Sequence, residues 1–391
     1  MSSSPYPLRP RASRPLTDFL CLESKDTIDV SAHLVTASLW GLPLAQMRDC
    51  AQDPIYHGEG DVATHTNMAL SCLVADPYFI AAPSSTRAVL FTATMFHDSA
   101  KPDCSKVVDS IIRSPGHSHR GEKLVRRVLW ELGVDPLERE KVAQLVRWHQ
   151  APYHLSLGPD FLRRLIEIST CVSISDLLAL SRADVTGRVA SDLADLSSRV
   201  NVFASQATVF NCATHPFNFL SDYSRFVYFN QYSSTTNNPF YQSYEPSDTP
   251  TLIIMSGLPG SGKSSWAASS SLPVVSLDAI RSRMGLPPAR HQLPVVLAAK
   301  NELRALLAKR ESCVYDATSL TRSLRAEIIS IASQYRSNVK IVSVETTKDE
   351  LWKRNRARGD RALPFKALSS MIARWEPPTL SEASAIEWIY T

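Results

Sequence analysis

Residues 257–264 (G-L-P-G-S-G-K-S) have the spacing of a phosphate-binding loop, in which glycines let backbone N–H groups converge on phosphate oxygens. The apolar residues 251–256 before the loop are typical of a buried parallel strand, and the residues after it can begin a helix whose N-terminus favours anions. Lys263 can then reach the β- and γ-phosphates, and the Ser264 hydroxyl can hold Mg²⁺. The candidate nucleotide-binding residues are Gly257, Gly260, Ser261, Gly262, Lys263, Ser264 and Ser265.

Two further polar residues of interest, Asp278 and Arg281, follow the short apolar run 274–277. The carboxyl ends of parallel strands meet at the edge of the sheet where ligands bind. An aspartate there can accept the proton of an attacking hydroxyl, and an arginine one helical turn later can hold a substrate phosphate. The alternative is an aspartate that only caps a helix beside a surface arginine.

The third apolar run, 313–316, ends at Asp316, which we expect near the phosphates or Mg²⁺ together with Thr318. Thr318 and Arg322 are candidate substrate contacts. The basic residues 352–364 are typical of a lid that closes over ATP, with Arg354 and Arg358 as candidates to contact its phosphates. The pattern leaves open which of the two arginines does so, and a solvated helix face is the alternative.

Histidines and aspartates occupy distinctive positions in the N-terminal half. Six of the ten histidines lie between residues 57 and 149, and one of them forms an adjacent His-Asp pair. A divalent metal needs nitrogen and oxygen ligands that converge from several rigid elements, and it can activate water for attack on a phosphoryl group. Lys101, one turn beyond the pair, can bind a phosphate oxygen. The residues of interest are His65, His97, Asp98, His117, His149 and Asp184.

The pattern of apolar residues divides the chain into an all-α part and an α/β part. We expect a disordered lead-in at residues 1–16, a helical domain at 17–210, an aromatic linker or interdomain segment at 211–248, and an α/β domain with a parallel sheet at 249–391. The rings in 211–248 either pack between domains, which we favour, or stack on bases. The helices expected around the histidines are 62–72, 86–97, 120–132, 136–148, 160–167 and 172–188.

Charge is unevenly distributed along the chain. Residues 249–391 contain 20 Lys and Arg against 12 Asp and Glu, a net charge of +8, whereas the rest of the chain has 22 against 26, a net of −4. A basic domain with a phosphate-binding loop suits a polyanionic substrate. The seven cysteines lack paired spacing, which favours free thiols and a cytoplasmic location, and no apolar run is long enough for a membrane span.

The order His65, His97-Asp98, Gly116-His117, His149 and Asp184 resembles the HD phosphohydrolase superfamily. The resemblance covers about residues 56–188 and implies an all-α HD-type domain. It implies that His65, His97, Asp98 and Asp184 hold a first metal, that His117 and His149 complete a second site or contact the scissile phosphate, and that Asp98 and Lys101 act in catalysis. Ser99 replaces the usual glycine after the His-Asp pair, and His57 and Glu59 are possible neighbours of the site.

The C-terminal part resembles P-loop polynucleotide kinases on four features: the phosphate-binding loop, Asp278 with Arg281, residues 316–318, and the basic run with Pro364. The resemblance implies that Asp278 is the general base for a 5′-hydroxyl and that Arg281 binds the neighbouring phosphate.

The two parts together resemble HD-Pnk, a family of bacterial bifunctional RNA-repair proteins, over about residues 50–391. That resemblance implies ATP, Mg²⁺ and a transition metal (Mn²⁺, Co²⁺ or Ni²⁺) as cofactors. It implies RNA ends with a 5′-hydroxyl and a 2′,3′-cyclic phosphate as substrates, with DNA as a possible further substrate, and a separate ligase acting afterwards. Two alternatives remain open: a nucleotide-salvage kinase fused to an HD nucleotidase, and an ATP-dependent sensor of RNA ends.

Overall fold

The structure is a computed structural model that describes residues 13–20, 28–155, 158, 160–231, 237–287, 292–359 and 362–391. The chain forms two compact units, which meet in sequence at Phe217 and Asn218 and are described separately. Most of the expected lead-in lies outside the described residues. So do Tyr232 of the aromatic segment and Asp360 and Arg361 of the basic run. Within the described part of the chain, no helix is both long and apolar enough to cross a membrane.

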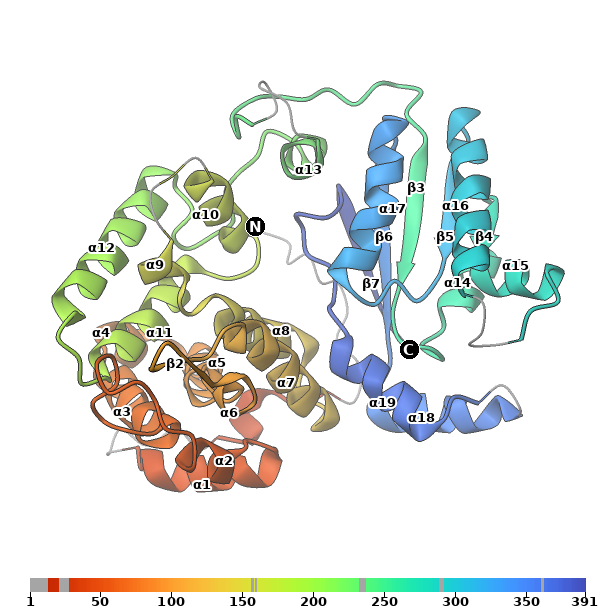
Figure 1. Cartoon of the computed structure of the whole chain (residues 1–391). Helices are drawn as coiled ribbons and strands as arrows, with labels where there is room; N and C mark the ends of the chain where they lie inside the picture. Colours follow the sequence, from red (N-terminus) through yellow and green to blue (C-terminus); the bar gives the residue numbers. More distant parts are fainter. Residues whose placement is uncertain are drawn as a thin grey trace. The chain divides into compact units, whose positions relative to one another are not determined.

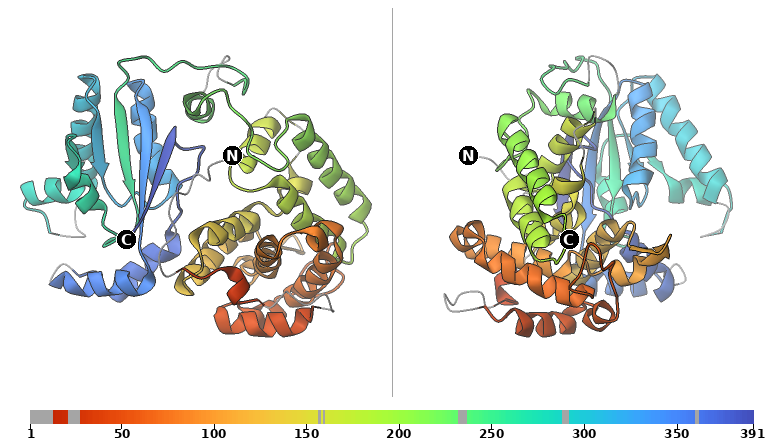
Figure 2. Two further views of the ribbon diagram at one scale, coloured as in Figure 1. Left: turned by 180° about the vertical axis from the view of Figure 1, so that it is seen from behind. Right: turned by 60° about the vertical axis from the view of Figure 1, so that its left-hand side comes forward.

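The first unit is helical, as the sequence predicts, with one short hairpin. Its central helix, α11, contacts α3, α5, α8 and α12, and Figure 2 shows these helices from two further sides. Its elements are η1 (Leu16–Asp18), α1 (Val30–Trp40), α2 (Leu44–Arg48), α3 (Val62–Ala75), α4 (Pro77–Ala81), α5 (Ser84–Phe96), α6 (Lys101–Cys104), β1 (Lys106–Val108), β2 (Ile111–Arg113), α7 (His117–Glu131), α8 (Pro136–Trp148), α9 (Ala151–His154), α10 (Phe161–Ser169), α11 (Ile174–Thr186) and α12 (Leu193–Val209).

The last residues of the expected disordered lead-in are ordered. Arg14 forms a bridge with Val134, and the backbone N–H of Leu16 donates to Glu138 at 2.6 Å. The Leu16 side chain is fully buried. The expectation of disorder was therefore wrong for residues 13–16, because a buried leucine gives this segment a place in the core.

Close backbone contact fixes how α3 and α11 pack. A Cβ atom placed on Gly187 would lie 2.5 Å from the Ala69 Cα atom, so only glycine allows this approach. The Gly187 carbonyl lies 3.2 Å from Nδ1 of His65. The contact therefore positions a histidine as well as two helices.

The second unit is built on a five-stranded, wholly parallel sheet of order β4-β5-β3-β6-β7 (Figure 1). The apolar runs 251–256, 274–277, 313–316 and 339–344 predict the first four of these strands in chain order, and β7 is an addition. The elements are α13 (Asp222–Asn230), β3 (Thr251–Ser256), α14 (Lys263–Ser269), β4 (Val274–Ser276), α15 (Leu277–Arg283), α16 (Gln292–Ala308), β5 (Cys313–Asp316), α17 (Arg322–Gln334), β6 (Asn338–Glu345), α18 (Lys348–Ala357), α19 (Phe365–Arg374) and β7 (Ala385–Tyr390).

Alternate residues of the strands face opposite sides of this sheet. Leu252 and Ile254 of β3 pack in the larger core with α16 and α17, whereas Ile253 and Met255 pack with α14. Both faces of the central strand are therefore buried, which explains why residues 251–256 are continuously apolar.

Part of the aromatic segment belongs to the second unit. Phe226 of α13 is fully buried in the larger core, and Arg225 donates to the Ser384 carbonyl at 2.8 Å. Phe240 and Tyr244 are exposed. Packing thus accounts for the buried rings of this segment, while the exposed rings remain unassigned.

A buried ion pair joins α17 to the segment before β7. The Arg325 guanidinium is fully buried, donates to Glu382 at 2.7 and 3.0 Å, and also donates to the carbonyls of Ser319 and Glu376. This arginine has a structural role, because it fixes the chain that follows β5 to the chain that precedes β7.

We expect Arg325→Met to lower the free energy of unfolding of the second unit by about 3–5 kcal/mol, because it leaves the Glu382 carboxylate buried without its partner. The double variant Arg325→Met/Glu382→Leu should recover part of that loss. Urea unfolding followed by circular dichroism measures both. Lys300→Met, which removes an ion pair with the exposed Glu327, is the control and should cost less than about 1 kcal/mol. Equal stability of the wild type and Arg325→Met would contradict the structural role.

Candidate functional site

The phosphate-binding loop lies between β3 and α14, as the spacing predicts. Gly257 has φ 146°, and a Cβ atom there would lie 2.2 Å from the Val344 carbonyl oxygen, so the loop can fold against β6 only with glycine. Gly260 and Gly262 also have positive φ values. The loop therefore has the backbone shape that turns N–H groups toward a phosphate.

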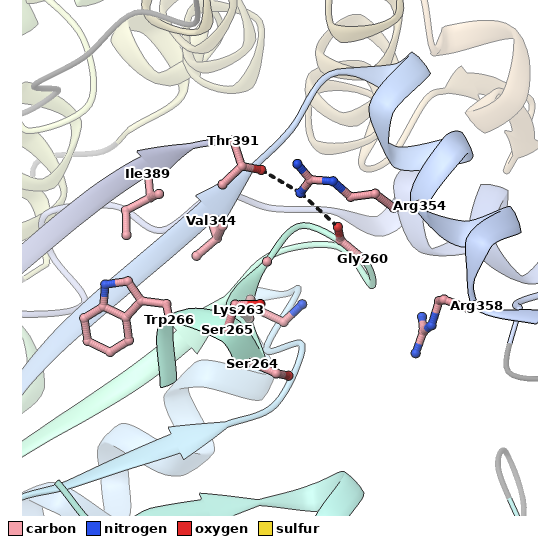
Figure 3. Close-up of a pocket in the computed structure, with 11 residues that line it drawn as sticks. Gly260, Lys263, Ser264, Ser265, Trp266, Val344, Arg354, Arg358, Ile389 and Thr391 are labelled. Carbon is pink, nitrogen blue, oxygen red and sulfur yellow. Dashed lines mark hydrogen bonds between the residues drawn. The ribbon is translucent and has the colours of Figure 1, made fainter. Parts of the chain in front are cut away.

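A pocket of about 740 Å³ opens beside this loop (Figure 3). It is lined by five of the seven loop residues expected to bind nucleotide, by both lid arginines, and by a wall from α14, β6 and β7. Trp266, Val344, Ile389 and Thr391 of that wall were not predicted. The full lining is Gly260, Gly262, Lys263, Ser264, Ser265, Trp266, Val344, Arg354, Arg358, Ile389 and Thr391.

Lys263 is buried at the base of the pocket, and its Nζ atom donates to the Leu258 carbonyl at 2.8 Å. Burial lowers the pKa of the ammonium group to about 8; Asp316 and Asp278 oppose this shift and Arg358 adds to it. Three residues predicted from separate parts of the sequence therefore act electrostatically on the same lysine.

The two lid arginines have different environments. Arg354 donates to Glu350 at 2.8 Å and to Thr391 Oγ1 at 2.9 Å, and its Nη1 atom lies 3.4 Å from the Gly260 carbonyl oxygen (Figure 3). Nη1 of Arg358 is buried and has no hydrogen-bond partner among the described residues. The second arginine is thus the one with a donor available for a phosphate.

Asp278 and Arg281 lie together on α15, after the end of the edge strand β4. They form an ion pair, and Arg281 also donates to Gln292 at 2.8 Å, while the Asp278 side chain is 80% exposed. Ser276, the last residue of β4, caps α15 and lies 3.4 Å from Asp316. The pair therefore occupies the predicted edge of the sheet.

Thr318 and Arg322, the other expected substrate contacts, have separate surroundings. The Thr318 carbonyl accepts from the Gly257 N–H at 3.0 Å, which places it against the phosphate-binding loop. Arg322 donates to Glu376 through its backbone and to Ser381 Oγ at 3.0 Å through its side chain. Its role toward a substrate stays a prediction.

In the helical unit, all six expected metal-site residues converge in one buried cluster. Around Oδ2 of Asp98, the Nε2 atoms of His97 and His65 lie at 3.3 and 3.7 Å, and His65 Nε2 lies 3.1 Å from Asp184. Around Oδ1 of the same aspartate, the Nε2 atoms of His117 and His149 lie at 3.2 and 3.7 Å. Asp98 therefore belongs to two histidine pairs, one at each carboxylate oxygen.

The hydrogen bonds at the back of the rings determine which nitrogen faces inward. Nδ1 of His97, His117 and His149 lies 2.7, 2.7 and 2.8 Å from the carbonyl oxygens of Thr94, Ser114 and Val146. A carbonyl only accepts, so each Nδ1 carries the proton and each Nε2 presents a lone pair to the cluster.

Lone pairs that face each other and two carboxylates need a cation between them. The two ring pairs have Nε2–Nε2 distances of 3.3 Å (His65 and His97) and 3.4 Å (His117 and His149), and Asp98 Oδ1 accepts no hydrogen bond of good geometry from the residues that the structure describes. Three-residue groups with ligand atoms within 4.8 Å of one another include His65-His97-Asp98 and Asp98-His117-His149. The donor set fits divalent metals with mixed nitrogen and oxygen coordination.

Charges around the cluster keep its carboxylates ionised. Burial opposes ionisation of Asp98, but the Lys101 ammonium, at 2.7 Å, holds the pKa of that carboxyl well below its usual range. Burial lowers the pKa of His149 to about 3, which keeps its ring neutral as a metal ligand requires. Lys101 also donates to Gln52 at 2.6 Å, so its ammonium group is fixed beside Asp98.

Three residues support the cluster, and of these the sequence indicated only Glu59 as a neighbour of the site. Glu59 lies 2.9 Å from Nδ1 of His65 and accepts from the Val189 N–H at 2.8 Å, so it orients the histidine from a loop. Tyr153 donates to Asp184 at 2.5 Å, and Arg188 pairs with the same carboxylate at 2.5 Å. The sequence signal for Arg188 is its position one helical turn after Asp184.

A comparison with protein families agrees with a P-loop domain in the second unit. A family model described as an AAA domain matches residues 252–378. A multifunctional CCA protein from Halorhodospira halophila is 30% identical over 131 residues, which are 33% of this chain. The chain spans 27% of the length of that relative.

Solved structures with similarity to this chain include several kinases. A kinase-like protein from Chloroflexus aurantiacus is 18% identical, with 37% of this chain and 89% of that chain covered and a TM-score of 0.33. A gluconokinase from Sinorhizobium meliloti is 22% identical, with 36% and 82% covered and a TM-score of 0.28. A Pnkp1/Rnl/Hen1 complex is 22% identical, with 29% and 40% covered and a TM-score of 0.25. At these scores the likenesses carry no argument about activity. The loop, the pocket and the family model are what support a P-loop kinase fold.

We expect ATP binding to take up close to one proton at pH 9 and about a tenth of a proton at pH 7. In the free protein Lys263 has a pKa of about 8 and is mostly neutral at pH 9. The bound phosphates raise that pKa, so the lysine regains its proton, whereas at pH 7 it is protonated in both states. Titration calorimetry in buffers of different ionisation enthalpy measures the uptake. Equal uptake at the two pH values would contradict the assignment.

We expect two Mn²⁺ ions per chain, with Asp98→Asn losing both because Asp98 belongs to both histidine pairs. His65→Ala and His149→Ala should each lose one ion. Electron paramagnetic resonance of free Mn²⁺ during a titration gives the count, and the exposed His215, remote in sequence from the cluster, provides the control variant His215→Ala. Loss of a single ion in Asp98→Asn would disprove the shared ligand.

Proposed function

We propose that this chain is a bifunctional nucleic-acid end-healing enzyme. One part would be an ATP-dependent kinase for 5′-hydroxyl ends. The other would be a metal-dependent phosphohydrolase of the HD type, for 2′,3′-cyclic phosphates and for 2′- and 3′-phosphates. The observation that carries the proposal is the presence in one chain of two separate sites for phosphate chemistry, the loop pocket with Asp278 and the cluster around Asp98.

The kinase half rests on residues at the carboxyl edge of the sheet. Lys263 would neutralise the transferring phosphate, and Ser264 would hold Mg²⁺ with the nucleotide. Arg358, whose Nη1 has no partner among the described residues, would donate to the same phosphate. Asp278, exposed beside Arg281, would accept the proton of the attacking 5′-hydroxyl while Arg281 binds the adjacent phosphodiester.

The phosphohydrolase half rests on the cluster around Asp98. His65, His97, Asp98 and Asp184 would hold one metal, and Asp98, His117 and His149 the other. When bound, such metals lower the pKa of a coordinated water and polarise a phosphoryl oxygen. Lys101 would bind a phosphate oxygen, since its ammonium group is already fixed at the rim of the donor set by Gln52.

The two reactions are complementary in their products. Cleavage of RNA by ribonucleases leaves a 5′-hydroxyl and a cyclic phosphate, and healing yields a 5′-phosphate and a 3′-hydroxyl that a ligase can seal. The net charge of +8 on residues 249–391 favours such a polyanionic substrate over a nucleoside.

The test is an RNA oligonucleotide that carries a 5′-hydroxyl and a 2′,3′-cyclic phosphate, incubated with ATP and Mg²⁺ and, separately, with Mn²⁺, Co²⁺ or Ni²⁺. The wild type should alter both ends. Lys263→Ala should lower the kinase rate by at least about 10²-fold and Asp98→Ala the phosphohydrolase rate similarly, each without effect on the other end.

Gel analysis of both ends resolves the alternatives. If only free nucleosides and nucleotides react, the enzyme belongs to nucleotide salvage. If Asp98→Ala retains phosphate release, the cluster has no catalytic role, and a sensor of RNA ends is the better description.

A further inference from the structure

A short hairpin lies in sequence between the His97-Asp98 pair and the second pair of metal-site histidines, His117 and His149. Strands β1 and β2 (β2 is labelled in Figure 1) lie in sequence between α6, which begins at Lys101, and α7, which begins at His117. The Ile112 N–H donates to Asp53 at 3.1 Å, and the hydroxyls of Ser105 and Ser114 lie 2.8 Å apart at the base of the hairpin. The Ser114 carbonyl is the acceptor for His117 Nδ1, so the base of the hairpin adjoins the cluster.

The turn of the hairpin fixes its register. Asp109 and Ser110 have φ values of 52° and 63°, as in the two-residue turns whose twist matches a hairpin. The pairing that results is Lys106 opposite Arg113, Val107 opposite Ile112 and Val108 opposite Ile111. A hairpin with this turn cannot slip by one residue without changing the face of every side chain.

This register places two cations directly opposite each other. Like charges in a cross-strand pair are unfavourable, because their Cβ atoms are only about 5 Å apart. Both side chains are exposed, and neither the Lys106 ammonium nor the Arg113 guanidinium has an ion pair or hydrogen bond to any part of the chain that the structure describes. An anion held between them would turn this repulsion into attraction.

We propose that Lys106 and Arg113 clamp the phosphodiester backbone of a single-stranded nucleic acid whose end occupies the cluster around Asp98. This inference rests on the proposed function. The pair would bracket a phosphate upstream of the reacting end, because it lies at the base of the hairpin, next to Ser114. Val108, which pairs with Ile111 on the same face of the hairpin as the two cations and is 36% exposed, offers apolar contact to a sugar or base beside that phosphate. The clamp would be independent of sequence, since it binds phosphate.

The clamp makes the enzyme distinguish a polymer from a small substrate. A cyclic mononucleotide has no upstream phosphate and reaches the cluster without the hairpin. An oligonucleotide with the same cyclic phosphate gains the two charge-assisted contacts. Removal of the charges should therefore weaken the polymer alone and act on KM, not on kcat.

The experiment compares the wild type with Lys106→Gln/Arg113→Gln on two substrates, a 2′,3′-cyclic mononucleotide and a ten-residue RNA that ends in the same cyclic phosphate. We expect the RNA KM to rise about tenfold, with the mononucleotide KM and both kcat values within about twofold. The slope of log KM against log salt concentration for the RNA should fall by about one to two. Arg48→Gln/Lys141→Gln, the same loss of charge at exposed residues of α2 and α8, is the control and should leave both substrates unchanged.

The outcomes distinguish failure of the proposed function from failure of the clamp. If the wild type hydrolyses neither substrate, the proposed function has failed. If it hydrolyses both and the hairpin variant changes the two KM values equally, or changes neither, the clamp is overturned. The single variants Lys106→Gln and Arg113→Gln guard against misfolding, and each should give part of the RNA effect with normal mononucleotide turnover.

Discussion

The buried carboxylate of Asp98 is the group on which the helical unit depends. A carboxylate in an apolar core is unstable unless cations and donors surround it. Here Lys101 supplies one fixed charge, and four histidine rings from four places in the chain face the carboxylate or its neighbour Asp184. The long helices α3, α5, α7 and α8 thus serve to bring imidazole nitrogens to a single point.

The histidine rings around Asp98 must themselves be held in place by the residues behind them. Each ring that faces the cluster is held from behind by an acceptor, three times by a backbone carbonyl near a helix end and once by Glu59. Such contacts orient metal ligands and fix their tautomers. Loss of the Glu59 carboxylate would therefore disturb His65 without removing any ligand atom.

The sequence was most informative where chemistry constrains residue type and spacing. The phosphate-binding loop, Asp278 after β4, and the histidine and aspartate positions were all predicted. The loop and Asp278 each follow an apolar run, whereas the histidines and aspartates were predicted from their types and their order along the chain. The hairpin and β7 were not predicted. The hairpin has only three residues per strand, and the apolar run 385–390, interrupted by Glu387 alone, is a strand signal that was overlooked. Contacts such as Glu59 with His65 depend on tertiary structure and leave no local pattern.

The order of the strands also sets the distance between the phosphate-binding loop and Asp278. The loop follows β3 and Asp278 follows β4, with β5 between them, so the two ends are separated by two strand spacings, about 10 Å. In-line attack needs the attacking oxygen about 3–3.5 Å from the phosphorus, so a gap of this size has room for a phosphate group on the loop and a hydroxyl beside Asp278. The strand order therefore fixes the gap between the loop and Asp278, and Asp316 and Thr318, at and just after the end of β5, lie in the middle of that gap.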